Sequence, residues 1–125
     1  MKNWLAAASI LIFFSCADSR EPAAQKDFDH SITSHGKALF QRRCQSCHYV
    51  NKDMSGPALK GVRSRWSDST LLYAFIRNSD SVIQVNPYAK SLWQAWNQTA
   101  MNPHPDLKDE DIFAILEYVD ASSVK

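Results

Sequence analysis

Two cysteines separated by two residues and followed at once by a histidine limit what this chain can be: Cys44-Gln45-Ser46-Cys47-His48. Two thiols at this spacing can reach neighbouring groups on one edge of a flat ligand, and the imidazole that follows is then placed beneath that ligand. The motif is typical of covalent haem attachment through two thioethers, with the histidine bound to the iron. A domain with this motif is expected to enclose a large planar cofactor.

Other uses of a cysteine pair need features that the sequence lacks. A disulfide oxidoreductase would need a strand before the motif and a βαβ pattern around it. A zinc site would need a second pair of ligands; no cysteine follows Cys47, and His104 alone does not complete a set of four. A structural disulfide between Cys44 and Cys47, which export would permit, leaves His48 unexplained. We therefore predict one haem c, attached covalently through two thioethers.

Apolar residues recur at helical spacing along the rest of the chain, and no stretch alternates long enough to predict a strand. Gly36, Leu39 and Phe40 form the apolar side of a helix expected to begin at Ser34 and to run into the cysteine pair. The other predicted stripes are Leu71, Leu72, Phe75 and Ile76 after a cap at Ser67; Ala89, Leu92, Trp93 and Trp96 after Asn86-Pro87; and Ile112, Ile115, Leu116 and Val119 after Asp109-Glu110-Asp111.

Glycines and prolines separate these helices. We expect a loop at 51–65, a connection at 78–85, and a loop at 101–105 that holds two prolines. Helices this short are marginal in water, and a domain of this size buries little surface. A haem would supply the apolar body that the stripes need. The prediction is an all-α fold of four or five short helices packed around one covalently bound haem.

The N-terminus has the pattern of an export signal. Lys2 precedes an apolar stretch of 11 residues, Trp4 to Phe14, which is shorter than the about 20 residues that span a bilayer as a helix. Phe13-Phe14-Ser15-Cys16 resembles the end of a bacterial lipoprotein signal, in which the cysteine becomes the lipidated first residue. Phe13 departs from the leucine usual there. An ordinary signal cleaved near 15–17 and an uncleaved anchor are the alternatives.

The chain thus divides into three parts. Residues 1–15 are predicted to be a signal peptide cleaved before Cys16. Residues 16–33 are polar, contain Pro22 and few large apolar side chains, and are predicted to form a flexible tether. Residues 34–125 are predicted to form the haem domain. We expect an exported protein, held on the periplasmic side of a membrane through lipidated Cys16.

The haem domain resembles class I cytochromes c over nearly its whole length. Gly36 and Phe40 stand eight and four residues before Cys44. In that family, residues at these positions pack an N-terminal helix against a C-terminal one, opposite a pair spaced like Ile115 and Tyr118. The resemblance implies the cytochrome c fold.

The loop after the haem motif also matches that family. Gly56-Pro57-Ala58-Leu59 is followed by Gly61, and in the family the carbonyl at the proline position accepts the proton of the ligating imidazole. The resemblance therefore implies that Pro57 orients His48. It also places Trp66 where related cytochromes have an indole that reaches a haem propionate, with Arg65 able to pair with the same group. A core tryptophan beside a solvated arginine is the alternative.

The resemblance implies Met101 as the second iron ligand beside His48, because it lies in a constrained loop before the last helix, where the family has its methionine. Asn102 departs from the proline that often follows that methionine. His104, in the same loop, is the rival ligand. Met54 is the other methionine considered, although it follows closely after His48.

The resemblance implies an electron carrier rather than an enzyme. Its partners would be redox proteins such as an oxidase, a reductase or a dehydrogenase, in a respiratory chain. The alternatives are a haem protein whose sixth ligand is labile, acting as a gas-binding or enzymatic site, and a cytochrome subunit dedicated to one dehydrogenase. A formal net charge of +1 gives no basic excess that would indicate nucleic acid.

Charges are unevenly distributed along the domain. Between 37 and 65 the only acidic residue is Asp53, and the basic residues are Lys37, Arg42, Arg43, Lys52, Lys60, Arg63 and Arg65. Between 106 and 120 the only basic residue is Lys108, and the acidic residues are Asp106, Asp109, Glu110, Asp111, Glu117 and Asp120. We expect an electric dipole, with an acidic partner steered to the haem edge near Arg42 and Arg43. Ordinary solvated surface charge is the alternative.

Overall fold

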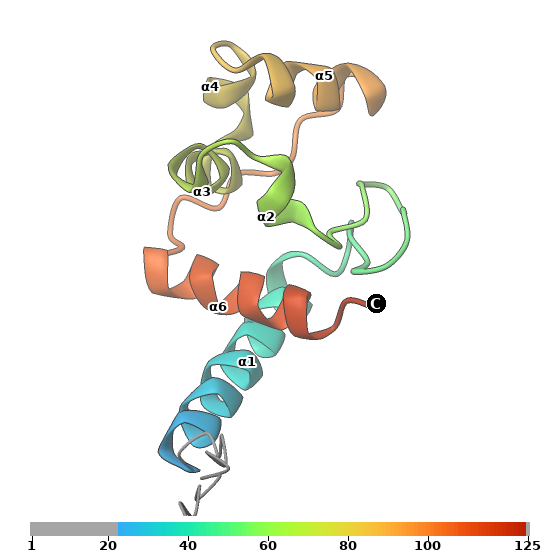
Figure 1. Cartoon of the computed structure of the whole chain (residues 1–125). Helices are drawn as coiled ribbons and strands as arrows, with labels where there is room; N and C mark the ends of the chain where they lie inside the picture. Colours follow the sequence, from blue (N-terminus) through green and yellow to red (C-terminus); the bar gives the residue numbers. More distant parts are fainter. Residues whose placement is uncertain (1–22, 125) are drawn as a thin grey trace, which may run out of the picture.

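The computed structural model of this protein describes residues 23–124, which form helices and loops and include no strand (Figure 1). The helices are α1 (Ala23–Arg43), α2 (Val62–Arg65), α3 (Ser69–Arg77), α4 (Ser79–Ile83), α5 (Pro87–Ala95) and α6 (Asp109–Ala121). The all-α prediction is confirmed. The six helices of the described residues exceed the predicted four or five, because α2 and α4 lie in segments expected to be a loop and a connection.

Side-chain caps set where the middle helices begin. α3 begins after Asp68, whose carboxylate accepts a backbone hydrogen bond at 2.7 Å, and not after Ser67 as predicted. Asn78 and Asn86 cap α4 and α5 in the same way. Pro87 occupies the first turn of α5, where its missing N–H costs nothing, as the sequence predicts.

α1 begins 11 residues before the predicted cap at Ser34, at Ala23. The predicted tether at 16–33 is therefore wrong over 23–33. No glycine or proline interrupts 23–35, so each residue added to a helix already nucleated near the domain gains one hydrogen bond. Ser34 lies inside the helix, where its hydroxyl donates to the Ser31 carbonyl at 2.9 Å. The side chains of residues 24–31 are exposed, and we call 23–34 the α1 arm.

The predicted signal peptide at 1–15, its cleavage site and the lipidated Cys16 lie outside the described residues. Among the helices of residues 23–124, none combines the length and the apolar character needed to cross a bilayer.

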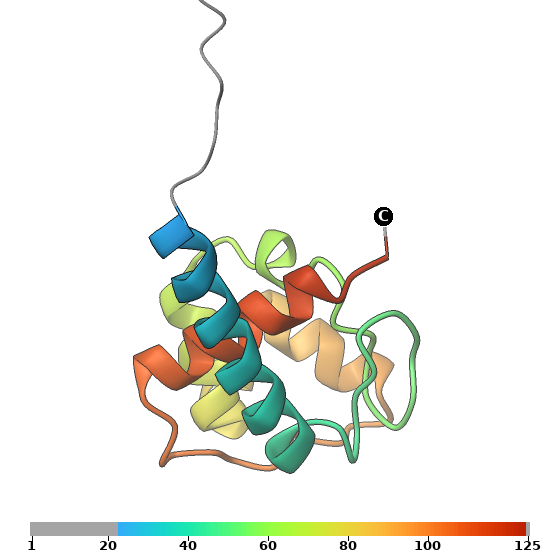
Figure 2. The same ribbon diagram turned by 90° about the horizontal axis from the view of Figure 1, so that it is seen from below.

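α1 crosses α6 at one end of the molecule, and this is the most extensive helix–helix contact (Figures 1 and 2). Gly36 allows the two backbones to meet, because a β-carbon there would overlap the carbonyl oxygen of Ala114. Phe40 packs on Tyr118 with ring centroids 5.3 Å apart. The predicted crossing therefore forms, with the closest backbone approach at Ala114.

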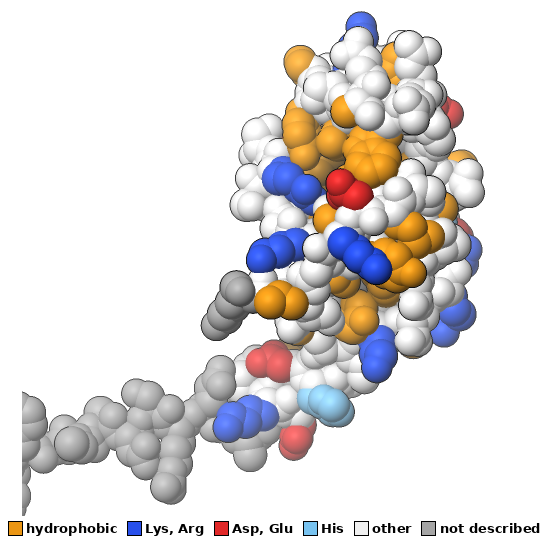
Figure 3. All heavy atoms as spheres, turned by 90° about the vertical axis from the view of Figure 1, so that its right-hand side faces the viewer, with side chains coloured by type: hydrophobic (Ala, Val, Ile, Leu, Met, Phe, Trp, Pro, Cys, Tyr) orange, Lys and Arg blue, Asp and Glu red, His pale blue; other side chains and the backbone are white. Residues whose placement is uncertain are grey.

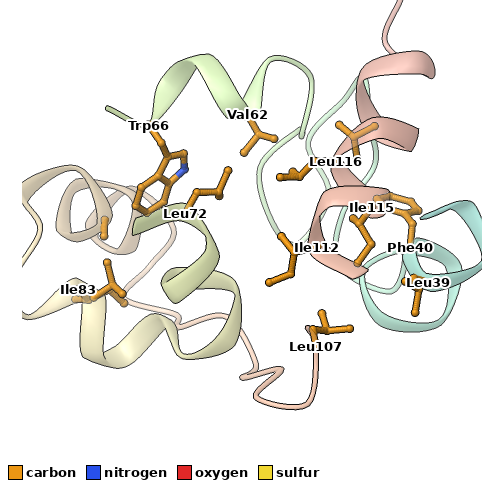
Figure 4. Packing of buried hydrophobic residues seen from close by; sticks show 13 residues of the cluster. Leu39, Phe40, Val62, Trp66, Leu72, Ile83, Leu107, Ile112, Ile115 and Leu116 are labelled. Carbon is orange, nitrogen blue, oxygen red and sulfur yellow. The ribbon is translucent and has the colours of Figure 1, made fainter. Parts of the chain in front are cut away.

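The buried core joins α6 to the middle helices. Its members are Leu39, Phe40, Val62, Trp66, Leu72, Val82, Ile83, Ala89, Leu107, Ile112, Ile115, Leu116 and Val119. Figure 4 shows Val62 and Leu72 between the indole of Trp66 and the α6 residues Ile112 and Leu116. The predicted stripes of α3 and α6 thus face a common interior.

Candidate haem site

The cysteine motif continues directly from the end of α1. The backbone N–H groups of Cys44 and His48 donate to Phe40 O and Cys44 O, both at 2.9 Å, so the chain keeps a helical turn through the motif. This turn leaves Cys44 half-buried and Cys47 exposed, both as free thiols, and buries His48. Burial raises the pKa of the Cys44 thiol to about 11, against the opposing charge of Arg43. Before haem is attached, Cys44 is therefore a neutral thiol at pH 7.

The imidazole of His48 is held in one orientation by the loop that follows. Its Nδ1 donates to Pro57 O at 2.8 Å, the contact that the cytochrome resemblance implies. Because a carbonyl only accepts, Nδ1 carries the proton and Nε2 keeps its lone pair. Gly56 lies against the ring, where a β-carbon would come within 2.5 Å of Cε1. His48 is thus presented as a ligand through Nε2.

A cavity of about 370 Å³ brings the predicted site residues together. Cys44, Cys47, His48, Pro57, Trp66 and Met101 all line it. Its apolar wall comes from Val62, Leu72, Phe75, Ile76, Leu92, Trp93, Trp96, Ile115 and Leu116. Covalently attached haem needs two thiols at one edge, an imidazole lone pair for the iron and an apolar wall around the ring. The residues present fit that group.

The structure narrows the choice of second iron ligand. Met101 and His104 both line the cavity, whereas Met54 is 38% exposed and does not line it. Burial lowers the pKa of His104 below its ordinary value, and the charge of Arg43 acts in the same direction. The imidazole of His104 is therefore neutral at pH 7 and chemically able to bind a metal, so Met101 and His104 stay the two candidates.

Trp66 belongs to both the cavity wall and the core. Its ring centroid lies 5.0 Å from that of Phe75 and 5.1 Å from that of Tyr88, in the second case edge to face. The neighbouring Arg65 donates to Ala58 O at 2.8 Å. The guanidinium thereby ties the loop after the haem motif to α2.

Ser79 is a residue of this region that the sequence does not indicate, because it falls in the predicted connection at 78–85. Ser79 is buried at the start of α4, and its hydroxyl donates to the carbonyl oxygen of Met101 at 2.8 Å. The two residues are 22 positions apart. No local pattern in the sequence indicates the contact, because it depends on how the helices pack.

Two arginines of the basic stretch at 37–65 form ion pairs with residues of the acidic stretch at 106–120. Arg63 pairs with Glu117 at 2.9 Å and with Asp120 at 3.4 Å, both on α6. Arg43 pairs with Asp106 at 2.5 Å. The fold thus brings residues of the two charged stretches into contact. Lys and Arg side chains still lie beside exposed hydrophobic side chains on the face drawn in Figure 3.

Comparisons with known proteins agree with this site. The family model described as cytochrome c matches residues 33–123. The structure of cytochrome c from Rhodothermus marinus is 32% identical, with a TM-score of 0.63, and the match covers 73% of this chain and 76% of that chain. Two engineered forms of that cytochrome, one bound to a carbene intermediate, are 31% identical, with TM-scores of 0.60 and 0.59 and the same coverage. A comparison with curated proteins found no match. A match over most of the chain, together with two thiols and an oriented histidine at one apolar cavity, shows that the chain belongs to the cytochrome c family, whose members bind haem covalently and carry electrons.

Proposed function

We propose that this protein carries single electrons through one haem c, attached to Cys44 and Cys47 and ligated by His48 and Met101. The observation that carries the proposal is the shared cavity of about 370 Å³, which both thiols, the oriented imidazole and the methionine line. The natural role is electron transfer and not catalysis, because two side-chain ligands would leave the iron no open position for a substrate.

The bound haem would supply one-electron chemistry at its iron. Around it, the hydrogen bond from His48 to Pro57 fixes the ring plane and increases the basicity of the ligating nitrogen. A methionine ligand favours the ferrous state and raises the reduction potential. The apolar wall excludes water, so few dipoles must reorient when the charge changes.

Covalent attachment is tested by extraction with acidified organic solvent. We expect the haem to stay with the polypeptide, because thioethers survive this treatment. Cys44→Ala and Cys47→Ala should each leave one thioether, detectable by mass spectrometry of the haem peptide. Haem recovered in the organic phase from the unaltered protein would contradict the proposal.

The iron ligand is tested by comparing Met101→Ala with His104→Ala. We expect Met101→Ala to abolish the near-infrared sulfur-to-iron band of the ferric protein and to allow carbon monoxide to bind the reduced protein. Met54→Ala is the matched control, because Met54 does not line the cavity. A band lost in His104→Ala and retained in Met101→Ala would reverse the assignment.

The second candidate function is gas binding or catalysis at a haem whose sixth ligand is labile. It is favoured by the presence of a competing imidazole, His104, on the same cavity as Met101. Rapid carbon monoxide binding to the unaltered reduced protein would support this gas-binding or enzymatic role over simple electron transfer. A cytochrome subunit dedicated to one dehydrogenase would share the chemistry of the carrier, and the protein that co-purifies would distinguish the two.

For its location, we propose export to the periplasmic side of a membrane, with lipid on Cys16 as anchor and an oxidase, reductase or dehydrogenase as partner. Support comes from the apolar stretch before Cys16 and from the α1 arm. Twelve helical residues reach about 18 Å, which would hold the haem away from the surface. Mass spectrometry of the mature N-terminus tests the anchor: an unmodified start at Ala17 or later would contradict it.

A further inference from the structure

The segment between α5 and α6 carries Met101 and His104 and has no helix of its own. Three hydrogen bonds join it to the junction of α3 and α4. The Ser79 hydroxyl donates to Met101 O at 2.8 Å. The backbone N–H of His104 donates to Arg77 O at 3.1 Å. Nε of Arg77 donates to Leu107 O at 2.9 Å. The stretch from Met101 to Leu107 is therefore attached at both of its ends to the α3–α4 junction.

The position of Ser79 is set by α4, and not by the segment between α5 and α6 to which its hydroxyl donates. It is the first residue of α4, directly after Asn78, which ends α3 and caps α4. Ser79 is 1% exposed, so water does not compete for its hydroxyl. A buried hydroxyl that lost its acceptor would be left unsatisfied, which is costly. Because the α3–α4 junction sets the position of the Ser79 hydroxyl, this hydrogen bond sets the position of the Met101 carbonyl.

We propose that Ser79 is a positioning residue for Met101, with Arg77 holding the far end of the same segment. By fixing the carbonyl of Met101, the Ser79 hydroxyl limits how far the thioether can move out of the cavity. This inference rests on the proposed ligation of the iron by Met101. It concerns the fraction of molecules in which that bond is open, and not the identity of the ligand.

External imidazole reports this fraction, because it binds ferric iron only where the methionine has left. Ser79→Ala removes the donor at almost constant volume, so the open fraction should rise. We expect the apparent affinity for imidazole to increase roughly fivefold, the effect of losing one ordinary net hydrogen bond. The near-infrared band should remain at low imidazole, since Met101 itself is intact.

Ser81→Ala is the matched control. The Ser81 hydroxyl donates to O of the capping Asn78 at 2.9 Å; Ser81 is exposed, and both of its side-chain-mediated hydrogen bonds are to Asn78 and not to Met101. We expect its imidazole affinity to equal that of the unaltered holoprotein. Ser79→Thr keeps the hydroxyl, so its imidazole affinity should lie close to that of the unaltered holoprotein. Denaturant unfolding of each variant separates this effect from a general loss of stability.

The outcomes are distinguishable. If Met101→Ala leaves the near-infrared band unchanged, the proposed ligand is wrong and the inference is overturned with it. If Met101→Ala abolishes the band but Ser79→Ala binds imidazole as the unaltered protein does, only the positioning role is overturned. Should Ser79→Ala not fold, Arg77→Lys carries the test, because lysine cannot bond Leu107 O and Asp109 together as Arg77 does. An unchanged imidazole affinity in Arg77→Lys would then overturn the proposal.

Discussion

Gly56 packs directly against the imidazole ring of His48, and the space at its α-carbon is too small for a side chain. A β-carbon at position 56 would lie 2.5 Å from Cε1 and 2.9 Å from Nδ1 of His48. Gly56→Ala should therefore push the ring away from Pro57 O and weaken that hydrogen bond. We expect a loss of about 2 kcal/mol in the free energy of unfolding, with a shifted reduction potential in a redox titration.

Gly61→Ala is the control for this prediction. Gly61 has a φ of 65°, and a β-carbon there would meet nothing closer than the Ser64 hydroxyl at 3.5 Å. We expect a cost of about 1 kcal/mol from the left-handed backbone alone, with the reduction potential unchanged. Equal shifts of potential in the two variants would show that Gly56 does not act through His48.

Among the elements, the crossing of α1 and α6 depends on close backbone contact. A β-carbon at Gly36 would overlap the carbonyl of Ala114, and a backbone atom cannot rotate away as a side chain does. Gly36→Ala should force the helices apart and reduce the free energy of unfolding by about 3 kcal/mol. Lys37→Ala, at an exposed position of the same turn, should change it little. Denaturant titration measures both, and a neutral Gly36→Ala would contradict the close crossing.

The same two helices share a pair that responds to pH. Nε2 of His35 lies 3.1 Å from Oδ1 of Asp111, and the Lys108 backbone N–H donates to Oδ2 at 3.2 Å. The hydrogen bond from His35, followed by that from Lys108, holds the pKa of Asp111 below its ordinary value. Because the folded pKa is lower than the unfolded one, ionised Asp111 stabilises the fold above the unfolded pKa. This contribution disappears as the pH falls through the folded pKa.

Asp111→Asn should accordingly lower stability at pH 7 and have less effect in strong acid, where Asp111 of the unaltered protein is protonated too. Unfolding midpoints measured from neutral pH down to about pH 3 test this. Glu110→Gln, at the exposed neighbouring position, removes the same charge without the two hydrogen bonds. A constant difference between Asp111→Asn and the unaltered protein across this range would contradict the linkage.

For the whole molecule, ion pairing decides which basic residues can steer a redox partner. Arg63 is compensated by Glu117 and Asp120, whereas Arg42 is exposed, close to Cys44 in sequence, and has no acidic partner within the described residues. Arg42→Gln should therefore slow the oxidation of the reduced protein by anionic hexacyanoferrate a few-fold at low salt. Arg63→Gln, with the same change in charge, should slow it less.

Salt provides the check on that prediction. Exposed charges interact weakly beyond about 10 Å at 0.1 M ionic strength, so the rate should fall as salt rises and the two variants should converge. Stopped-flow absorbance follows the reaction. A rate that is flat with ionic strength and equal in the two variants would show that the face near Arg42 does not steer anions.

The features that could be predicted from the sequence are those set by residues close together in the chain. The spacing of Cys44, Cys47 and His48 indicated the cofactor, and Asn86-Pro87 marked the start of α5. Caps, turns and attachment motifs act within a few positions, so their residue types suffice. The start of α3 was displaced by one residue because two capping side chains, Ser67 and Asp68, are adjacent. The α1 arm was missed because elongation from a nucleated helix outweighs its polar composition.

Contacts between distant residues were decided by the tertiary structure alone. The hydroxyl of Ser79 meets Met101 O, and Arg63 meets two carboxylates of α6, only once α2, α4 and α6 are packed. A serine or an arginine has many acceptors within reach of an unfolded chain, so its residue type does not select one. Packing removes water and most of these acceptors. The sequence by itself therefore determined which cofactor the protein is built for, and the fold determined that the Ser79 hydroxyl meets the Met101 carbonyl.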